Sequence, residues 1–409
     1  MLDSHILDLI ERFEDEISSA FKRFDQISFL NHQRVAEAFS QAQVATEHFQ
    51  STTGYGHDDL GREKFDQLFA LLFKAEAALA RINFVSGTHA IGCALLANLE
   101  PGSEVVFAFG KPYDTFEGVL RYTKEKLKGN LVFVEHEHWH DYKVISDIVL
   151  KSLTERTKLV FLQRSRGYCA KRPSINILQL KEMIQAIKKY NPAIICLVDN
   201  CYGEFVEESE PIEAGADLIA GSLIKNPGGG IVSSGGYVAG KREYVQASAD
   251  RLTVPGIGGE GGPNFGEGRL LFQGLYLAPR AVNQALKSVT LAARVFEHLG
   301  FKTDPHWSNQ RTDTILRIDI GSREKLIEIC RFLQSQSPID SHLTPEPAIT
   351  PGYEDSLIMA AGTFIEGSTS ELSADAPLRP PYSLFLQGGL SYYYTKLILI
   401  EYLRRYSGA

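Results

Sequence analysis

Hydrophobic residues recur at three- and four-residue spacing along the first part of the chain, with acidic residues between them. The first of these are Ile6, Leu9, Ile10 and Phe13. This is the pattern of an amphipathic helix, and we expect a helix over residues 6–48. A stretch rich in Gly and Asp, residues 51–59, interrupts the pattern as a loop. A second helix is predicted over residues 62–79.

The pattern changes between residues 82 and 240, where short apolar runs alternate with helical segments. The runs are rich in Val, Ile, Leu and Phe and are bounded by polar residues or Gly. Strands that are apolar throughout are typical of a mainly parallel sheet between layers of helices. The predicted strands are 104–109, 131–134, 158–162, 194–198, 218–220 and 237–239.

The C-terminal part mixes helical and strand patterns, as expected for a smaller α+β domain. Helices are predicted at 279–299, 323–334 and 392–406, and strands at 314–320, 356–360 and 384–386. We therefore expect three units: an N-terminal helical segment over 1–60, a large α/β domain over 61–270 and a small domain over 271–409. The 409 residues exceed what a single hydrophobic core usually supports.

Composition narrows the class of protein. The formal net charge of -8 argues against sequence-independent nucleic-acid binding, which needs concentrated Lys and Arg. The five cysteines are scattered and form no CxxC pair, so we expect free thiols in a reducing compartment. The N-terminus lacks the features of a secretory signal, and no apolar run is long enough to span a membrane. We expect a cytoplasmic enzyme.

Two polar residues stand at the ends of predicted buried strands. Asp199 follows Ile194–Val198, and Lys225 follows Asp217–Ile224. The carboxyl ends of parallel strands open onto the ligand crevice, so an acid and an amine delivered there could face one small molecule. Pyridoxal 5′-phosphate needs such a pair: a lysine for a Schiff base, and a carboxylate that keeps the pyridine nitrogen protonated. Taken singly, Asp199 could cap a loop and Lys225 could be solvated.

A phosphate site is the next requirement of that cofactor. An apolar run passes through Ser86-Gly87-Thr88 into an Ala- and Leu-rich helix. A helix start binds phosphate through its N–H groups, and Gly lets the anion approach closely. Ser222 could donate to the same phosphate. An ordinary helix cap remains the alternative.

Other candidate residues lie on loops. Tyr113 follows the strand at 104–109 and could stack on a pyridine ring. Arg379 could hold a substrate carboxylate by a bidentate contact. For each, simple surface exposure is the alternative.

Two further motifs are weaker. Residues 256–261 match GxGxxG but lack the flanking strand and helix of a dinucleotide site, so a mobile glycine-rich active-site loop is preferred. His136, His138 and His140 alternate along 135–141 and could share one face. Because no separate ligand set accompanies them, we interpret this stretch as a solvated strand end and predict no metal site.

Several segments together resemble the methionine gamma-lyase-like family, also called aluminium-resistance proteins, in the Cys/Met-metabolism branch of fold-type I pyridoxal-phosphate enzymes. The resemblance covers almost the whole chain. The segments are Gly54–Gly56, Phe84–Ala90, Gln163–Tyr168, Val198–Phe205, Gly221–Gly229, Glu371–Asp375 and Leu386–Gly389.

The resemblance implies an aspartate aminotransferase-like fold, with a mainly parallel seven-stranded sheet and a smaller C-terminal domain. It implies a homodimer or homotetramer with the active site at the subunit interface, and pyridoxal 5′-phosphate as cofactor. The implied roles are a Schiff base at Lys225, the pyridine partner at Asp199, ring stacking by Tyr113 and substrate carboxylate binding by Arg379. Ser86, Gly87, Thr88 and Ser222 would hold the phosphate, with Tyr55 of the neighbouring subunit.

The chain departs from typical members of the branch at two places. Ile224, not a hydroxyl residue, precedes the lysine, and Tyr55-Gly56-His57 stands where Tyr-x-Arg is usual. His57 and Arg62 are the candidates to replace that arginine.

The function we expect is elimination of a thiol from a sulfur-containing amino acid, of the methionine gamma-lyase or cystathionine beta-lyase type. The alternatives are another reaction of the same cofactor (aldolase, transaminase or decarboxylase) and a non-catalytic nucleotide-binding protein.

Overall fold

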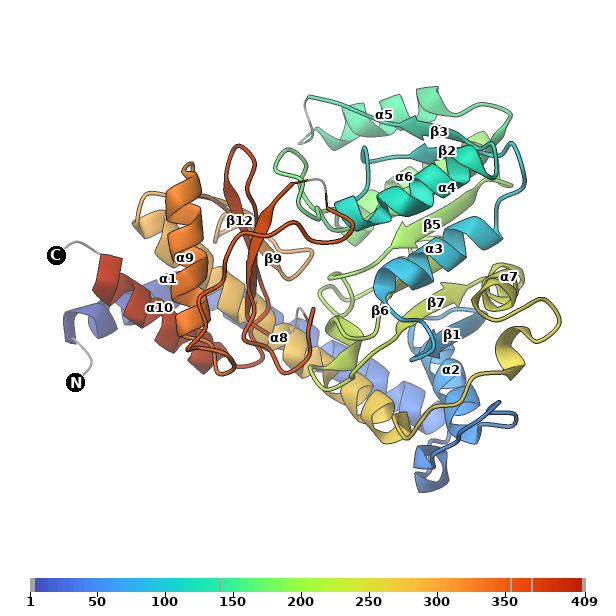
Figure 1. Ribbon diagram of the computed structural model, residues 1–409, viewed down its shortest axis with the longest axis horizontal. Coiled ribbons are helices and arrows are strands. Elements are labelled where there is room, and N and C mark those ends of the chain that lie inside the picture. Colours follow the sequence, from blue (N-terminus) through green and yellow to red (C-terminus); the bar gives the residue numbers. More distant parts are fainter. Residues whose placement is uncertain (1–3, 138, 140, 354, 369–370, 407–409) are drawn as a thin grey trace.

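The computed structural model describes residues 4–137, 139, 141–353, 355–368 and 371–406. Figure 1 shows two lobes, each built on a β-sheet. The larger sheet has seven strands in the order β1-β7-β6-β5-β4-β2-β3. They are β1 (Ala77–Arg81), β2 (Glu104–Phe107), β3 (Asn130–Phe133), β4 (Thr157–Gln163), β5 (Ile195–Asp199), β6 (Leu218–Ser222) and β7 (Gly236–Gly240).

Strands β2 to β6 pair in parallel, and β7 runs antiparallel to both of its neighbours. The predicted mainly parallel seven-stranded sheet is therefore confirmed. All six strands expected from apolar runs are present.

Neighbouring residues along each strand enter different cores, because strand side chains alternate between the two faces of a sheet. Val106, Val160 and Val198 face one cluster of buried residues, whereas Val105, Leu159 and Leu197 face another. Helices α2 (Leu60–Leu72), α5 (Tyr142–Ser152) and α6 (Ile177–Tyr190) cover the first face. Helices α3 (Gly87–Ala97), α4 (Glu117–Glu125) and α7 (Arg242–Leu252) cover the second.

The prediction for the first 80 residues is wrong in two places. Helix α1 (Ser4–Gln41) ends well before residue 48, and Gln43 adopts a left-handed conformation with φ 52°. The expected helix 62–79 ends at Leu72, and Lys74 is again left-handed at φ 54°. The Ala-rich residues that follow form β1, because antiparallel pairing with β7 outweighs their helix propensity.

The smaller lobe contains a five-stranded antiparallel sheet in the order β10-β11-β12-β9-β8. Its strands are β8 (Lys302–Asp304), β9 (Ile315–Asp319), β10 (Leu357–Ala360), β11 (Ser373–Pro377) and β12 (Ser383–Gln387). Helices α9 (Arg323–Ser335) and α10 (Tyr392–Tyr406) pack with it. The expected α+β character of this lobe is confirmed, although β8 and β11 were not predicted.

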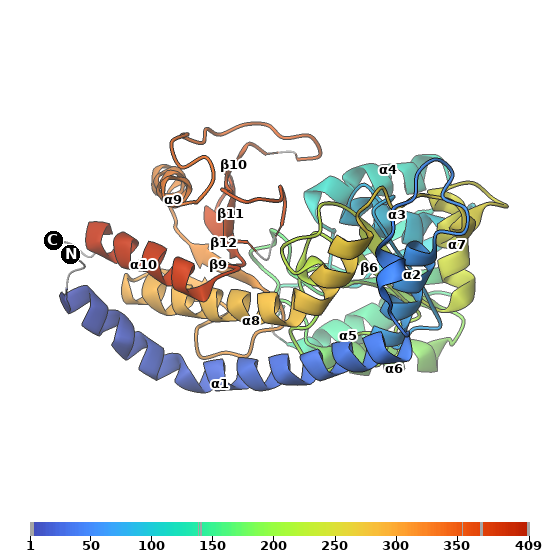
Figure 2. The ribbon, with the colours of Figure 1, turned by 90° about the horizontal axis from the view of Figure 1, so that it is seen from below.

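Two long helices connect the lobes. Figure 2 shows α1 and α8 (Gly268–His298) side by side along one side of both lobes. The expected start of α8 near residue 279 is wrong, because the helix begins a full eleven positions earlier and contains Pro279 in its interior. Short 3₁₀ turns occur at Thr46–Phe49, Asp114–Phe116, Asn226–Gly228 and Gly258–Glu260.

The five cysteines are unpaired, as predicted. Within the described residues, no helix combines the length and apolar character that crossing a membrane requires.

Candidate active site

A cavity of about 650 Å³ opens where strands β4, β5 and β6 of the large sheet end. The ends of these strands, the start of α3 and the loop at 113–115 line it from the large lobe. Tyr353 and residues 364–367 line it from the small-lobe part of the chain. Ligands bind at this edge of a parallel sheet because the polar strand-end loops converge there.

Asp199 and Lys225 both line this cavity. The parallel pairing of β5 with β6 sets Asp199 opposite Ala220, and Lys225 follows three residues after β6 ends at Ser222. The two side chains are therefore delivered from neighbouring strand ends to one space, as the sequence led us to expect.

Lys225 is held by a tyrosine that the sequence analysis did not single out. Its Nζ donates a 2.7 Å hydrogen bond to the Tyr202 hydroxyl and lies 3.9 Å from the centre of that ring. Burial disfavours the ammonium form, but Tyr202, Cys201 and Asp375 outweigh it and raise the pKa of Lys225. The groups around Lys225 therefore favour its protonated form.

Burial also controls Asp199, whose carboxyl pKa is raised from about 3.8 to about 6. The backbone N–H of Cys201 donates to its Oδ1 at 3.1 Å and, together with Lys225, limits that rise. A buried carboxylate of this kind gains from a positively charged partner.

The start of α3 and the end of β6 form a close-fitting cradle. A Cβ atom on Gly87 would lie 2.8 Å from the Cβ of Ser222, so only Gly allows this approach. The Ser86 hydroxyl accepts from the N–H of His89 and caps the helix. Since the first N–H groups of a helix lack carbonyl partners in their own helix, the cradle is suited to an anion. Thr88, whose hydroxyl lies 3.4 Å from that of Thr115, borders the same space.

Tyr113 lies in the cavity wall on the loop after β2. Its ring centre is 5.6 Å from that of Phe116, and burial raises the pKa of its hydroxyl well above the ordinary range. The side chain is a fixed neutral aromatic group beside the space in front of Asp199.

Two predicted site residues are not brought into this cavity. Tyr55 is 83% exposed and stacks on His57 with ring centres 5.7 Å apart. Arg379 lies in an adjoining pocket that shares Tyr113 with the cavity, and it bonds Asp355 at 2.8 Å. Weaker contacts at 3.4 and 3.5 Å join it to Asp114.

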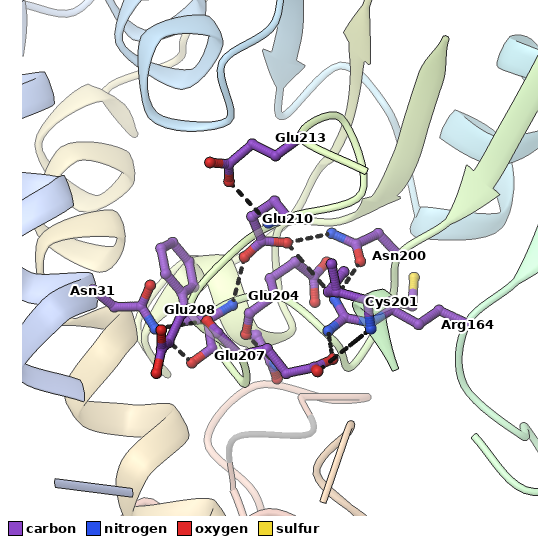
Figure 3. Close-up of polar contacts among 12 residues, drawn as sticks. Asn31, Arg164, Asn200, Cys201, Glu204, Glu207, Glu208, Glu210 and Glu213 are labelled. Carbon is purple, nitrogen blue, oxygen red and sulfur yellow. Dashed lines mark hydrogen bonds and ion pairs between the residues drawn. The ribbon is translucent and has the colours of Figure 1, made fainter. Parts of the chain in front are cut away.

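A buried polar network fixes the chain just after Asp199 (Figure 3). Arg164 is fully enclosed and donates to Asn200 Oδ1 at 2.8 Å and to Glu207 at 2.7 Å. Its backbone N–H donates to the carbonyl of Asp199 at 3.1 Å. Asn200 in turn donates to Glu210 at 3.1 Å. Because a buried arginine with carboxylate partners tolerates little displacement, this network holds the end of β5 in place.

The same network reaches the long N-terminal helix. Asn31 of α1 donates to the backbone carbonyls of Phe205 at 2.9 Å and Glu207 at 3.2 Å, and Figure 3 shows it beside the loop that follows β5. The helix that connects the lobes is thus tied to the segment that positions Asp199.

The two weaker motifs of the sequence do not add to this site. The backbone of 259–262 accepts hydrogen bonds from Arg62 and Arg81, and the GxGxxG stretch is not among the described residues lining the cavity. Its mobility stays a prediction. His138 and His140 lie outside the described residues, among which no group of three or more His, Cys, Asp or Glu is placed to hold a metal ion.

Several cavity residues received no role from the sequence: Tyr168, Tyr202, Tyr353 and the residues 364–367. Tyr168 and Tyr202 lie inside segments that carry the family resemblance, so their presence there was the available signal. Tyr353 and 364–367 come from a region without regular pattern, and only the fold brings them to the cavity.

The two sheets, their strand order and the strand-end cavity define a fold-type I pyridoxal-phosphate enzyme fold. A structure from Campylobacter jejuni named "putative O-acetylhomoserine (thiol)-lyase", which contains pyridoxyl-lysine monophosphate, shares this fold at 14% identity, with a TM-score of 0.57 over 83% of this chain and 85% of that one.

The chain belongs to the methionine gamma-lyase family, whose model matches residues 6–407. It is 45% identical to YnbB of Bacillus subtilis (strain 168) over 94% of this chain and 92% of that protein. It is also similar to a structure from Listeria innocua named "putative cystathionine beta-lyase involved in aluminum resistance". That similarity has a TM-score of 0.92, 42% identity and 99% coverage of both chains.

Replacing Gly87 with Ala tests the cradle. The added Cβ meets Ser222 at 2.8 Å, so Gly87→Ala should weaken pyridoxal-phosphate affinity by at least about tenfold in a fluorescence titration. Gly92→Ala is the matched control on the same helix, because its Cβ meets only the Val119 side chain at 3.4 Å. Equal pyridoxal-phosphate affinity of both variants and the native protein would contradict the role of the cradle in binding the phosphate.

Replacing Asp199 with Asn tests the cost of its buried charge. The carboxyl pKa of Asp199 is near 6 in the folded protein, against 3.8 in the unfolded chain. The free energy of unfolding therefore falls as the pH rises from about 4 to 6, and above that range the full loss is about 3 kcal/mol. Asp199→Asn should therefore stabilise the cofactor-free protein more at pH 8 than at pH 5 in urea titrations. An equal gain in stability at both pH values would show that burial does not raise the pKa of the Asp199 carboxyl.

Proposed function

We propose that this chain is a pyridoxal 5′-phosphate-dependent carbon–sulfur lyase acting on a sulfur-containing amino acid. The observation that carries the proposal is the delivery of Lys225 and Asp199 to one cavity beside the Gly87 cradle. The family and the name of the Listeria innocua structure support the reaction class.

The residues present fit the cofactor. The cradle of Gly87, Thr88 and Ser222 would hold the phosphate, Asp199 would face the pyridine nitrogen, and Lys225 would bond covalently to the aldehyde carbon. The Tyr113 hydroxyl lies in the cavity wall beside Thr88, where it could reach a ligand. When bound, pyridoxal phosphate supplies an electron sink for the substrate α-carbon.

The chain's own groups would then move protons and hold charges. A positively charged ring nitrogen beside Asp199 would lower the carboxyl pKa back toward its ordinary range. Lys225, as a neutral amine, would be able to take the α-proton of the substrate. In a β-elimination, loss of that proton and of the thiolate would break the Cα–H and Cβ–S bonds. The thiolate would take up a proton to leave as a thiol, and hydrolysis of the remaining imine would give ammonia and a 2-oxo acid.

Arg379 is proposed to bind the substrate carboxylate. In the structure its guanidinium is shared between Asp355 and Asp114, in a pocket that adjoins the cavity. Substrate binding by this arginine therefore requires it to exchange at least one of these carboxylates for that of the substrate.

We further propose a homodimer or homotetramer in which the Tyr55 loop completes the neighbouring subunit's site. Arg62 is fixed within its own chain, because its guanidinium donates to the carbonyls of Gly56, Glu260 and Gly262. His57 is exposed and stacks on Tyr55. Of the two candidates to replace the missing arginine, the geometry favours His57.

Trapping the cofactor tests the lysine. Borohydride reduction of the holoenzyme followed by peptide mass mapping should give a pyridoxyl adduct on Lys225. Lys225→Ala should remove the adduct and lower turnover by at least about a thousandfold, since the covalent anchor and the base are both lost. Lys241→Ala, which changes a half-exposed lysine paired with Asp217, should keep both. An adduct elsewhere would overturn the assignment.

The reaction class is tested by the products. Holoenzyme incubated with methionine, cystathionine or cysteine should release a thiol and a 2-oxo acid. Amino transfer without thiol release would replace the lyase by a transaminase, because the fold does not fix the reaction type.

Mixing two inactive variants tests the shared site. Lys225→Ala and Tyr55→Phe subunits, each weakly active alone, should regain about a quarter of native activity when they are unfolded and refolded together. Half of the randomly formed dimers are mixed, and in each mixed dimer one of the two sites has both an intact Lys225 and an intact Tyr55. If Tyr55 served its own subunit, the mixture would regain nothing. In the control, Tyr276→Phe takes the place of Tyr55→Phe. Tyr276 is exposed on α8, so this variant should be fully active alone.

A further inference from the structure

Tyr202 contacts the side-chain nitrogen of Lys225 in two ways, and the reaction outlined above gives it no role. Its hydroxyl oxygen accepts a 2.7 Å hydrogen bond from Lys225 Nζ. The same nitrogen lies 3.9 Å from the centre of the Tyr202 ring, within the range in which an aromatic face attracts an ammonium group. Both residues line the cavity, so the pair lies where a ligand would bind.

The backbone holds Tyr202 in a conformation that residues other than Gly rarely adopt. Its φ is 72°, in the left-handed region. Strain of this kind persists where the surrounding structure fixes a residue, and it is concentrated at functional sites. The next residue is fixed in this way, because a Cβ on Gly203 would overlap the Arg164 guanidinium. Since Gly at position 202 would relieve the strain, the tyrosine side chain indicates a role beyond the turn.

Other titratable groups also lie close enough to Lys225 to affect its charge, from the segment after β5, from β11 and from the small-lobe part of the chain. They are Asp199, Cys201, Asp375 and Tyr353. Burial opposes the charge of Lys225, and the largest of the effects that raise its pKa comes from Tyr202. Burial also raises the pKa of the Tyr202 hydroxyl to about 12, so at neutral pH Tyr202 acts on the lysine as a neutral group.

The two contacts suit both forms of Lys225 in a proton transfer. A neutral amine that donates one N–H to the Tyr202 oxygen keeps its lone pair free for the α-hydrogen of the substrate. In the transfer the Cα–H bond breaks, an N–H bond forms on Lys225, and the bonding electron pair stays with the substrate. The hydroxyl oxygen and the ring face both interact more strongly with the resulting ammonium than with the amine. The contacts therefore strengthen as the proton moves.

We propose that Tyr202 is a positioning residue for this proton transfer, which orients the Lys225 amine and stabilises the ammonium that it becomes. The inference rests on the proposed function, because it gives the base of that reaction a partner. Removing the hydroxyl should weaken Lys225 as a base.

Acetylation of Lys225 in the cofactor-free protein tests the contact without turnover. Acetic anhydride reacts with the neutral amine, so the rate at a fixed pH, followed by peptide mass mapping, reports how much of Lys225 is unprotonated. Tyr202→Phe keeps the ring and removes the hydrogen-bond acceptor, and should raise this rate at least about fivefold. Tyr244→Phe is the matched control, because Tyr244 lies near another lysine, with its ring centre 6.0 Å from Lys241 Nζ. This control should keep the native rate at Lys225.

Exchange of the α-hydrogen of L-alanine in heavy water tests the proton transfer in the holoenzyme. Alanine has no thiol to lose, so its NMR signal reports the base separately from the lyase reaction. Tyr202→Phe should lower the maximal exchange rate at least about tenfold, and the rise of the rate with pH should move to lower pH. Tyr244→Phe should change neither.

The results separate the inference from the function beneath it. Faster acetylation together with slower exchange supports the inference. A native rate in either measurement overturns it, and so does a loss of exchange that is equal at every pH, which would leave Tyr202 a structural role. Absence of exchange in the native holoenzyme also overturns it, while thiol release still decides the lyase. If alanine exchanges but no sulfur amino acid releases thiol, the lyase fails and the two Tyr202→Phe measurements still decide the inference.

Discussion

The site depends on the parallel pairing of β5 with β6. That register sets Asp199 opposite Ala220 and sends Lys225 into the same cavity a few residues beyond Ser222. Burial makes the charge of Asp199 costly, and the N–H and side chain of Cys201, with the charges of Lys225 and Arg172, offset part of that cost. Under the proposed function, the positively charged ring nitrogen of the cofactor would stabilise this buried carboxylate.

The small-lobe part of the chain forms part of the cavity wall, through Tyr353 and residues 364–367. Asp375 and Gln387 come from neighbouring strands of its sheet, and Tyr168 of the large lobe bonds the first of them across the lobe boundary. Helices α1 and α8 run along both lobes, and Asn31 of α1 is bonded to the loop after β5. The placement of the small lobe against the cavity therefore depends on contacts along the whole chain.

The sequence predicts the large sheet well because its strands are apolar on both faces, and the cavity residues Asp199, Lys225, Gly87 and Tyr113 could be found from strand ends and a helix start. It fails at β1, where Ala-rich residues favour helix and only the pairing with β7 makes a strand. It also fails at β11, whose Ser373-Ala374-Asp375-Ala376-Pro377 lacks the apolar signal of a strand. Tyr353 and residues 364–367 reach the cavity only through the tertiary fold, so no local pattern could have placed them.

The central claim is that Lys225 and Asp199 act on a single aromatic ring. A crystal structure of the protein with pyridoxal phosphate tests it most directly. The account predicts continuous density from the Lys225 side chain to the cofactor, the pyridine nitrogen within hydrogen-bond distance of Asp199, and the phosphate at the start of α3. A cofactor bound elsewhere, with Lys225 still on the Tyr202 hydroxyl, would contradict it.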